Sequence, residues 1–220
     1  STPIKSSAAS DVYKRQGITN NTRYDGGAAP GVVKYKDQNG DGKITTADRT
    51  VIGNAMPKWF GGITNSFSFK GIDFSFMLQY SYGNDVFNAT RQFATGSQDQ
   101  RYNMLAEVAD RWSPTNASNK VPSTKGYVKG DVYSRFVEDG SFLRLKNMTL
   151  GYSLPKKWIN KIHISKLRIY GTAQNLFCIS GYSGYDPEVS TAASNPMTPG
   201  LDWGAYPKSK VFTFGLDIQF

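Results

Sequence analysis

The sequence contains few of the residues from which catalytic and metal sites are usually built. Its 220 residues include one cysteine, Cys178, and one histidine, His163. A single cysteine excludes an internal disulfide and any metal site made of cysteines. A Ser-His-Asp hydrolase would depend entirely on His163, and residues 160–165 around it do not resemble a catalytic setting. We therefore predict that His163 is a solvated turn residue and that the protein is not an enzyme.

The sequence also lacks a long hydrophobic run. No stretch of about 18 apolar residues occurs, which excludes a helix that spans a membrane. Strands of a transmembrane barrel alternate apolar and polar residues, so their average is a low mean hydropathy such as the −0.46 of this chain. Aromatic residues make up 14% of the sequence, and flat rings suit a pleated sheet. The composition therefore favours strands and leaves a membrane location open.

The net charge of +9 does not indicate a nucleic-acid partner. Lysines lie mostly in predicted loops and turns, where solvated charge is common. Nucleic-acid binding would require basic and aromatic residues together on one compact face, and no such patch is evident.

The first residues are set apart from the rest. Residues 6–16, SSAASDVYKRQ, resemble translated sequencing-adapter sequence, and they are short, polar and without pattern. We interpret residues 1–16 as a non-native or disordered leader and expect the fold in residues 17–220. On this interpretation the natural protein extends upstream, and its signal peptide is missing.

Alternation of apolar and polar residues predicts five antiparallel strands. The clearest run is 72–82, in which Met77 is the one exception to the alternation. Its length suits one tilted membrane crossing, which takes about 9–11 residues. Lys70-Gly71 predicts a tight hairpin before this strand, and a break in parity at Lys146-Asn147 predicts a bulge. The five strands are expected near 60–69, 72–82, 142–154, 166–178 and 210–220.

The lengths of the connections favour a barrel over a soluble sandwich, whose core could produce the same alternation. Connections at 70–71 and 155–166 are short, whereas those at 83–141 and 180–209 are long. Strict alternation of short and long loops is typical of an up-and-down transmembrane barrel with short periplasmic turns and long extracellular loops. A sandwich with Greek-key links has no reason to keep this order. The chain is therefore expected to be an all-β barrel fragment whose C-terminus is periplasmic.

One short helix is expected in the first long loop. Ser97 and Gln100 match a capping box, apolar residues follow at helical spacing, and Pro114 ends the run. These apolar residues are Leu105, Val108, Ala109 and Trp112.

One stretch has the spacing of a calcium-binding loop. Carboxylate or amide groups stand at positions 1, 3 and 5, glycine at 6 and a carboxylate at 12, and a backbone carbonyl at 7 would add another oxygen. Position 12 is aspartate rather than glutamate, and no amphipathic helices flank the loop. A structural calcium site and an Asx-rich turn without an ion both remain open. The predicted ligands are Asp37, Asn39, Asp41, Lys43 and Asp48.

Six stretches of the chain, in the expected order, resemble the C-terminal barrel region of SusC/RagA-type TonB-linked outer-membrane proteins. The resemblance covers nearly all of residues 31–220. The stretches are DQNGDGKITTADRTVIG, GNDVFNATRQF, RFVEDGSFLRLKNMTLGYSLPK, LRIYGTAQNLF, SGYDPEVS and GAYPKSKVFTFGLDIQF.

The resemblance implies that these are the last five strands of a barrel of roughly 22 strands, plugged by an N-terminal domain that this chain lacks. It implies an active importer in the outer membrane of a Gram-negative bacterium, energised through TonB. Such an importer would take up glycans or peptides with a SusD-like surface lipoprotein, and its strands would contact outer-membrane lipid. The terminal Phe220 resembles the signal by which the barrel-assembly machinery recognises a last strand.

Two other functions are weighed against import. A secreted calcium-binding β-domain that binds carbohydrate would be soluble, whereas an importer would fractionate with the outer membrane. A hydrolase borne on a barrel needs a nucleophile with a partnered base, which His163 does not provide. The sequence does not indicate which residues bind a substrate.

Overall fold

The chain forms two compact units, which we name the sheet unit and the loop unit. The sheet unit comprises Pro57–Gly83, Gly140–Gly181 and Tyr206–Phe220, and the loop unit comprises Ser1–Met56, Asn84–Asp139 and Tyr182–Ala205. Our computed structural model describes residues 4–7, 10–12, 31–42, 44–96, 102–118, 120–123, 132–159, 163–188 and 199–220. Among these residues, no helix is both long enough and apolar enough to cross a membrane.

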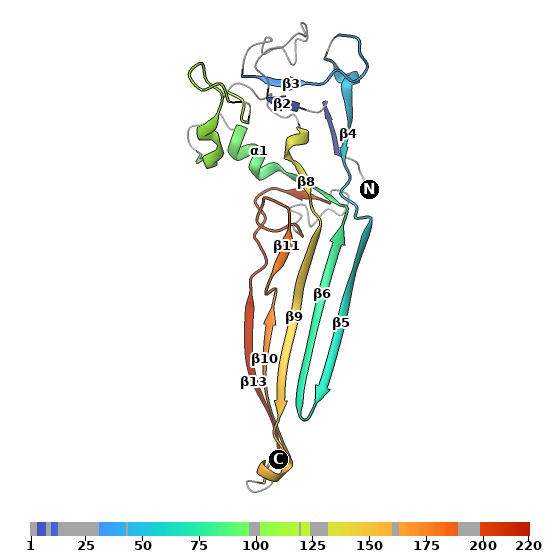
Figure 1. Ribbon diagram of the computed structural model, residues 1–220, viewed down its shortest axis with the longest axis vertical. Coiled ribbons are helices and arrows are strands. Elements are labelled where there is room, and N and C mark those ends of the chain that lie inside the picture. Colours follow the sequence, from blue (N-terminus) through green and yellow to red (C-terminus); the bar gives the residue numbers. More distant parts are fainter. Residues whose placement is uncertain are drawn as a thin grey trace. The chain divides into compact units, whose positions relative to one another are not determined.

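The five long strands of the sheet unit follow an up-and-down order (Figure 1). Each strand pairs antiparallel with the next one along the chain of this unit, which gives the spatial order β5-β6-β9-β10-β13. Within the described residues the sheet is open, with β5 and β13 at its edges. The five predicted strands are confirmed. They are β5 (Trp59–Phe69), β6 (Ile72–Tyr82), β9 (Phe142–Ser153), β10 (Lys166–Gln174) and β13 (Val211–Gln219).

The predicted hairpin turn and bulge are also confirmed. Lys70 and Gly71 have φ angles of 49° and 88°, and two positive φ angles are what a two-residue turn of type I′ requires. In the pairing of β6 with β9, Met77 lies opposite Asn147 and the next residue, Leu78, lies opposite Leu145. Lys146 is therefore the extra residue of a bulge.

The fourth predicted strand is shorter than expected. β10 ends at Gln174 rather than at residue 178, because Asn175 adopts a φ of 51° that a strand does not accommodate. The backbone N–H of Asn175 donates to the carbonyl of Lys146 at 3.1 Å. The chain then rejoins β9 as a short strand, β11 (Cys178–Ser180).

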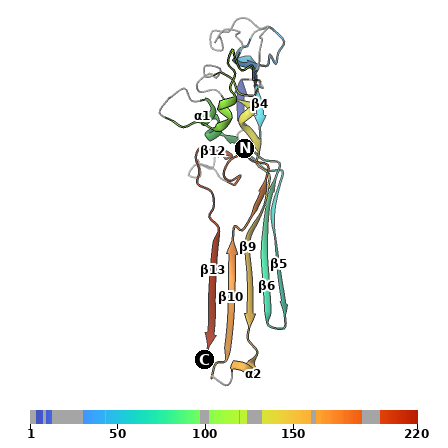
Figure 2. The ribbon, with the colours of Figure 1, turned by 60° about the vertical axis from the view of Figure 1, so that its left-hand side comes forward.

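The short connection between β9 and β10 contains a four-residue helix, α2 (Lys156–Ile159), which is labelled in Figure 2. His163 follows it, exposed and with a φ of 56°. The residue lies in a turn, as the sequence predicts.

The loop unit has a sheet and a core of its own. Its central strand, β7 (Asp85–Asn88), pairs antiparallel with β8 (Val137–Asp139) and parallel with β12 (Leu201–Asp202). The sequence pattern predicts that both long connections are loops with one helix, so this sheet is a correction. A buried apolar cluster lies in the same unit and comprises Val33, Tyr35, Ile44, Tyr133 and Phe136.

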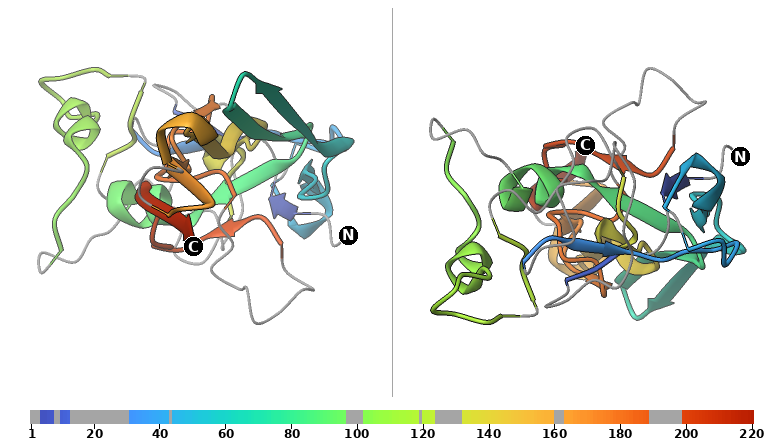
Figure 3. Two further views of the ribbon diagram at one scale, coloured as in Figure 1. Left: turned by 90° about the horizontal axis from the view of Figure 1, so that it is seen from below. Right: turned by 90° about the horizontal axis from the view of Figure 1, so that it is seen from above.

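The helices of the loop unit differ from the predicted one. α1 (Ala89–Gly96) is the green coil of Figure 3, as distinct from the yellow-green coil of residues 106–110. It begins after Asn88, whose side-chain oxygen accepts the N–H of Arg91 at 2.8 Å. Near residue 105, where a short helix is predicted, Ala106–Asp110 form a 3-10 helix, η2, without a side-chain cap. Its expected capping residues, Ser97 and Gln100, lie outside the described residues.

The remaining elements are short. β1 pairs antiparallel with β4, and β2 with β3. β1 and β2 fall within residues 1–16, and the interpretation of that segment as a leader stays a prediction. The elements are β1 (Ile4–Ser7), β2 (Ser10–Val12), β3 (Val33–Tyr35), η1 (Thr46–Asp48), β4 (Arg49–Gly53) and η3 (Ser134–Phe136).

Candidate functional site

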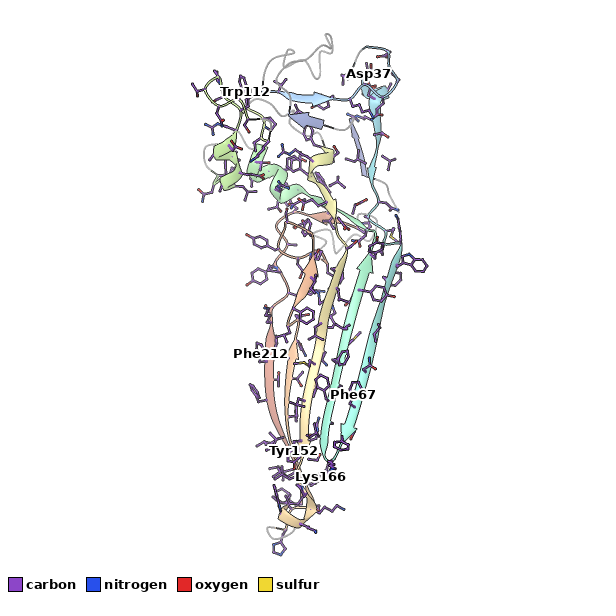
Figure 4. All side chains as sticks on the ribbon, in the orientation of Figure 1. Asp37, Phe67, Trp112, Tyr152, Lys166 and Phe212 are labelled. Atoms are coloured by element: carbon purple, nitrogen blue, oxygen red, sulfur yellow. The ribbon has the colours of Figure 1, made fainter. Side chains whose placement is uncertain are left out.

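One face of the sheet unit is apolar and exposed. The register places Phe67, Phe74, Leu150, Gly171 and Phe214 in a single row across all five strands. Phe214 is 85% exposed. Soluble monomers rarely expose a contiguous apolar surface over a whole sheet. Further exposed residues of this face, some labelled in Figure 4, are Trp59, Ile63, Phe69, Ile72, Tyr152, Ile169, Phe212, Leu216 and Ile218.

The opposite face of the sheet unit is polar. The neighbouring row consists of Ser66, Ser75, Thr149, Thr172 and Thr213, one from each strand. The hydroxyl groups of Thr149 and Thr172 are 3.1 Å apart and share a hydrogen bond. An apolar face opposite a polar one is the arrangement of a transmembrane barrel wall, which meets lipid outside and a polar lumen inside.

The polar face carries an ion network that joins three strands. Arg168 on β10 donates from Nε and Nη2 to the two carboxylate oxygens of Asp73 on β6, at 3.0 and 2.5 Å. Its Nη1 donates to Asp217 on β13 at 3.2 Å. This network is not predictable from the sequence, because the partners are 95 and 49 residues apart and no local pattern connects them.

Glu138 connects three segments of the loop unit. Its carboxylate accepts the backbone N–H and the hydroxyl of Ser183, both at 2.8 Å. It also accepts hydrogen bonds from Nη1 of Arg91 at 3.2 Å and from the side-chain amide of Asn88 at 3.3 Å. One side chain of β8 thus holds the start of α1 and the segment after residue 181.

Arg91 extends this network to the segment that contains η2. Its Nε and Nη2 donate to both oxygens of Glu107 at 2.9 Å. These bonds lower the pKa of Glu107 below its ordinary value of 4.5, although burial opposes them. This bidentate arrangement, with two parallel hydrogen bonds, is the geometry in which an arginine binds a carboxylate most strongly.

Tyr182 and Asp202 form a buried pair in the same unit. The phenol of Tyr182 donates to the carboxylate of Asp202 at 2.6 Å. Burial, and after it this hydrogen bond, raise the pKa of Tyr182 above its ordinary value of 10.0. The contacts of Glu138, Arg91 and Tyr182 are those of a polar interior, so they hold the loop unit together.

The predicted calcium loop is an exposed turn held by its own side chains. The two oxygens of Asp37 accept the backbone N–H groups of Gly40 and Gly42, at 2.6 and 2.8 Å. Asn39 accepts the N–H of Asp41 at 2.9 Å, and its amide donates to the Asp41 carboxylate at 3.1 Å. Three of the five predicted ligands therefore lie close together.

Asp48, the last predicted ligand, is fully buried. Its carboxylate accepts the backbone N–H groups of Gln38 and Thr45, at 3.0 and 2.6 Å, and so completes a capping box at η1. Burial alone would raise the pKa of Asp48, but the bonds from Thr45 and Gln38 hold it below the ordinary value of 3.8. Lys43 lies outside the described residues, among which no three His, Cys, Asp or Glu side chains gather as a metal site.

Phe220, the predicted assembly signal, follows β13 directly. Its ring is 90% exposed and continues the series of apolar residues on that strand. The geometry is compatible with recognition by another protein or with a lipid interface, and its role stays a prediction.

Known proteins resemble this chain in sequence. The chain is 36% identical over 200 residues to TonB-dependent receptor P3 of Formosa agariphila, which spans 89% of the chain and 20% of that protein. It is 32% identical over 215 residues to TonB-dependent receptor SusC of Bacteroides thetaiotaomicron, which spans 97% of the chain and again 20% of the relative. The chain thus corresponds to about a fifth of the length of these relatives. No family model matches the chain.

The fold also matches solved structures. The structure of the RagAB peptide transporter superimposes with a TM-score of 0.75 at 24% identity, over 99% of this chain and 22% of that one. The RagAB peptide importer in its open-open state gives a TM-score of 0.74 at 23% identity. These structures share the fold of the chain. The sequence relatives make the chain homologous, over most of its own length, to TonB-dependent receptors, and the resemblance to SusC/RagA-type proteins is confirmed.

Proposed function

We propose that this chain is part of an active importer in the outer membrane of a Gram-negative bacterium. The observation that carries the proposal is the apolar face, which runs across all five strands and keeps residues such as Phe214 and Phe67 exposed. Outer-membrane lipid would cover that face. The polar face would line the lumen of a closed barrel of roughly 22 strands, to which these strands contribute.

The relatives support the proposed energy source and partner. Proteins named TonB-dependent receptors are the most direct support for coupling to TonB. The SusC and RagAB resemblance supports a SusD-like lipoprotein partner and a glycan or peptide substrate. Coupling would act through an N-terminal region, so the present residues supply the wall and loops of the importer.

Fractionation and uptake test the proposal. The complete protein that contains this chain should sediment with outer membranes and resist extraction by carbonate. Uptake of oligosaccharides or oligopeptides should require it and should stop when TonB is deleted. A soluble secreted protein would contradict the proposal and support the carbohydrate-binding alternative, which the exposed apolar face does not favour.

We also propose a structural calcium ion at the loop of Asp37, Asn39, Asp41 and Asp48. All four donors are hard oxygens, the type that calcium prefers. The two oxygens of Asp37 each accept one N–H and so keep a second lone pair for a cation. Calcium should therefore raise the thermal stability of the complete protein, and the double substitution Asp37→Ala with Asp41→Ala should abolish that gain. Equal stability in calcium and in chelator would favour the Asx-rich turn.

A further inference from the structure

Alternation decides which face a strand presents, but it does not decide the position of the strand along its neighbour. A slip of β13 by one residue would turn Asp217 and Gln219 to the apolar face, and the alternation opposes this. A slip by two residues leaves every side chain on its own face. Contacts that are specific to single positions must therefore set the register of β13 on β10.

Arg168 makes such a contact with β13. It lies directly opposite Asp217, to which it donates at 3.2 Å. After a slip of two residues it would lie opposite Gly215 or Gln219, neither of which carries a charge. The register seen here is the one in which the guanidinium meets a carboxylate.

The other side of the same guanidinium is anchored two strands away. Both oxygens of Asp73 on β6 accept from it, and a bidentate pair fixes the plane of an arginine as well as its position. Arg168 is therefore held in place independently of β13. This anchoring turns it into a fixed reference against which the last strand aligns.

A glycine makes the long reach from β10 to β6 feasible. Gly151 on β9 lies opposite Asp73 on one side and Tyr170 on the other. A Cβ atom at Gly151 would lie 2.5 Å from Oδ1 of Asp73 and 2.6 Å from Nη2 of Arg168. The ion pair occupies the space that a side chain of β9 would otherwise fill.

A second glycine repeats this arrangement between β10 and β13. Gly215 lies opposite Tyr170, and a Cβ atom there would overlap the phenol ring. The guanidinium of Arg168 stands 4.8 Å from the centre of the same ring, a cation–π contact. After a slip of two residues, Tyr170 would face Thr213 or Asp217, whose side chains need the space of the ring.

We infer that Arg168 is a positioning residue that sets the register of β13 on β10, with Asp73 as its anchor, Asp217 as its target, and Gly151 and Gly215 as the spaces it requires. The inference rests on the proposed function in one respect, since it assumes that β13 inserts in the outer membrane as part of a barrel wall.

Disulfide cross-linking in the complete protein measures the register directly. In a Cys178→Ser background, Thr172→Cys with Thr213→Cys reports the observed register, because these residues are opposite each other. Thr172→Cys with Val211→Cys and Gln174→Cys with Thr213→Cys report slips of two residues in the two directions. A slip of two residues displaces a pair by about 6–7 Å along the strand, beyond disulfide reach.

With Arg168 and both glycines unchanged, the pair Thr172→Cys with Thr213→Cys should cross-link, and the two pairs that report slips should scarcely do so. Arg168→Gln should raise the slipped cross-links about fivefold, the change expected when an ion pair of this exposure is lost. Gly151→Ala should do the same. Gly171→Ala is the matched control, because its Cβ would meet the Phe214 ring at an ordinary 3.4 Å.

Exclusive cross-linking in the observed register with Arg168→Gln in place would overturn the inference. If that variant does not reach the membrane, Arg168→Lys decides, because lysine keeps the charge but loses the bidentate fork. Slipped cross-links with lysine support the inference, and their absence contradicts it. If the Cys178→Ser protein with an unchanged Arg168 network is itself missing from the outer membrane, that result contradicts the proposed function and the inference with it.

Discussion

Aromatic side chains have opposite surroundings in the two units. In the loop unit, Tyr133 and Phe136 are fully buried against each other, with ring centres 6.4 Å apart. In the sheet unit, Phe212 and Phe214 are more than half exposed although they belong to the most regular part of the chain. The proposed function accounts for the difference by two solvents, because burial is expected for a unit surrounded by water and exposure for a sheet that faces lipid.

The polar groups differ in a corresponding way. The long strands of the sheet unit satisfy their backbone groups mainly through regular strand pairing. The loop unit depends on individual carboxylates, such as Glu138 and Asp48, that accept backbone and side-chain donors. Single substitutions should therefore affect the loop unit through particular contacts and, outside the Arg168 network, the sheet unit through its pattern.

The largest effect is expected in the core of the loop unit. Phe136→Ala should lower the free energy of unfolding of that unit by about 3–5 kcal/mol, because a fully buried aromatic ring leaves a cavity. Urea-dependent proteolysis of the loops in the complete protein measures the change. Phe93→Ala, at a residue 39% exposed, is the control and should cost much less. Equal losses would contradict the assignment of a separate core.

The next effect separates the two faces of the sheet unit. Phe214→Lys should destabilise the protein in lipid by roughly 2–4 kcal/mol, the cost of a charge near the middle of a barrel's lipid face. Thr213→Lys, one residue away on the polar face, should cost far less. Urea titrations in phospholipid vesicles compare the two variants. A greater loss for Thr213→Lys would reverse the assignment of the faces.

A smaller effect concerns pH and the loop unit alone. Because the folded pKa of Glu107 lies below 4.5, its pair with Arg91 stabilises the fold above that pH and loses this contribution as the pH falls through the folded pKa. The loss should be about 1 kcal/mol for a partly exposed pair. Glu107→Gln should remove that part of the pH dependence, whereas Asp110→Asn, whose contact with Lys120 is 3.7 Å long, should not. Hydrogen exchange of the loop amides between pH 3 and pH 6 tests this.

The smallest effect on stability is expected at the C-terminus. Phe220→Ala should scarcely change unfolding, because the ring is 90% exposed and at the end of its strand. It should still lower the amount of protein that reaches the outer membrane if the assembly machinery reads this residue. Surface quantity and uptake per inserted molecule are the two measurements. Normal quantity with defective uptake would instead place Phe220 in the transport cycle.

Residues of the sheet unit carried enough local information to predict its strands. Alternation across Ile72–Tyr82, the glycine of Lys70-Gly71 and the parity break at Lys146 each depend on neighbours in sequence, and each is confirmed. The end of β10 was missed, although asparagine is among the few residues that adopt a positive φ readily. Asn175 was a usable signal in that position.

The loop unit could not be predicted in the same way. β7, β8 and β12 have two to four residues each, too few for a period to be visible, and β7 pairs with strands about 50 and 110 residues away. The short helix expected near residue 105 follows from a capping box, apolar spacing and Pro114, and Ala106–Asp110 form it as a 3-10 helix. Beyond it, the N–H of Trp112 bonds to the carbonyl of Val121, a partner that no local pattern indicates. The Arg168 network could not be predicted either, because its partners are also far apart in the sequence.

The bulge in β9 bears on how the chain can change in length during evolution. Leu145 and Met148 share the apolar face although they are three positions apart. Deleting one residue at Lys146-Asn147 would leave them two apart and still on that face, whereas a deletion elsewhere in β9 would turn over part of the strand. Insertions and deletions among related chains should therefore gather at this position, and alignments of β9 should place their gap there.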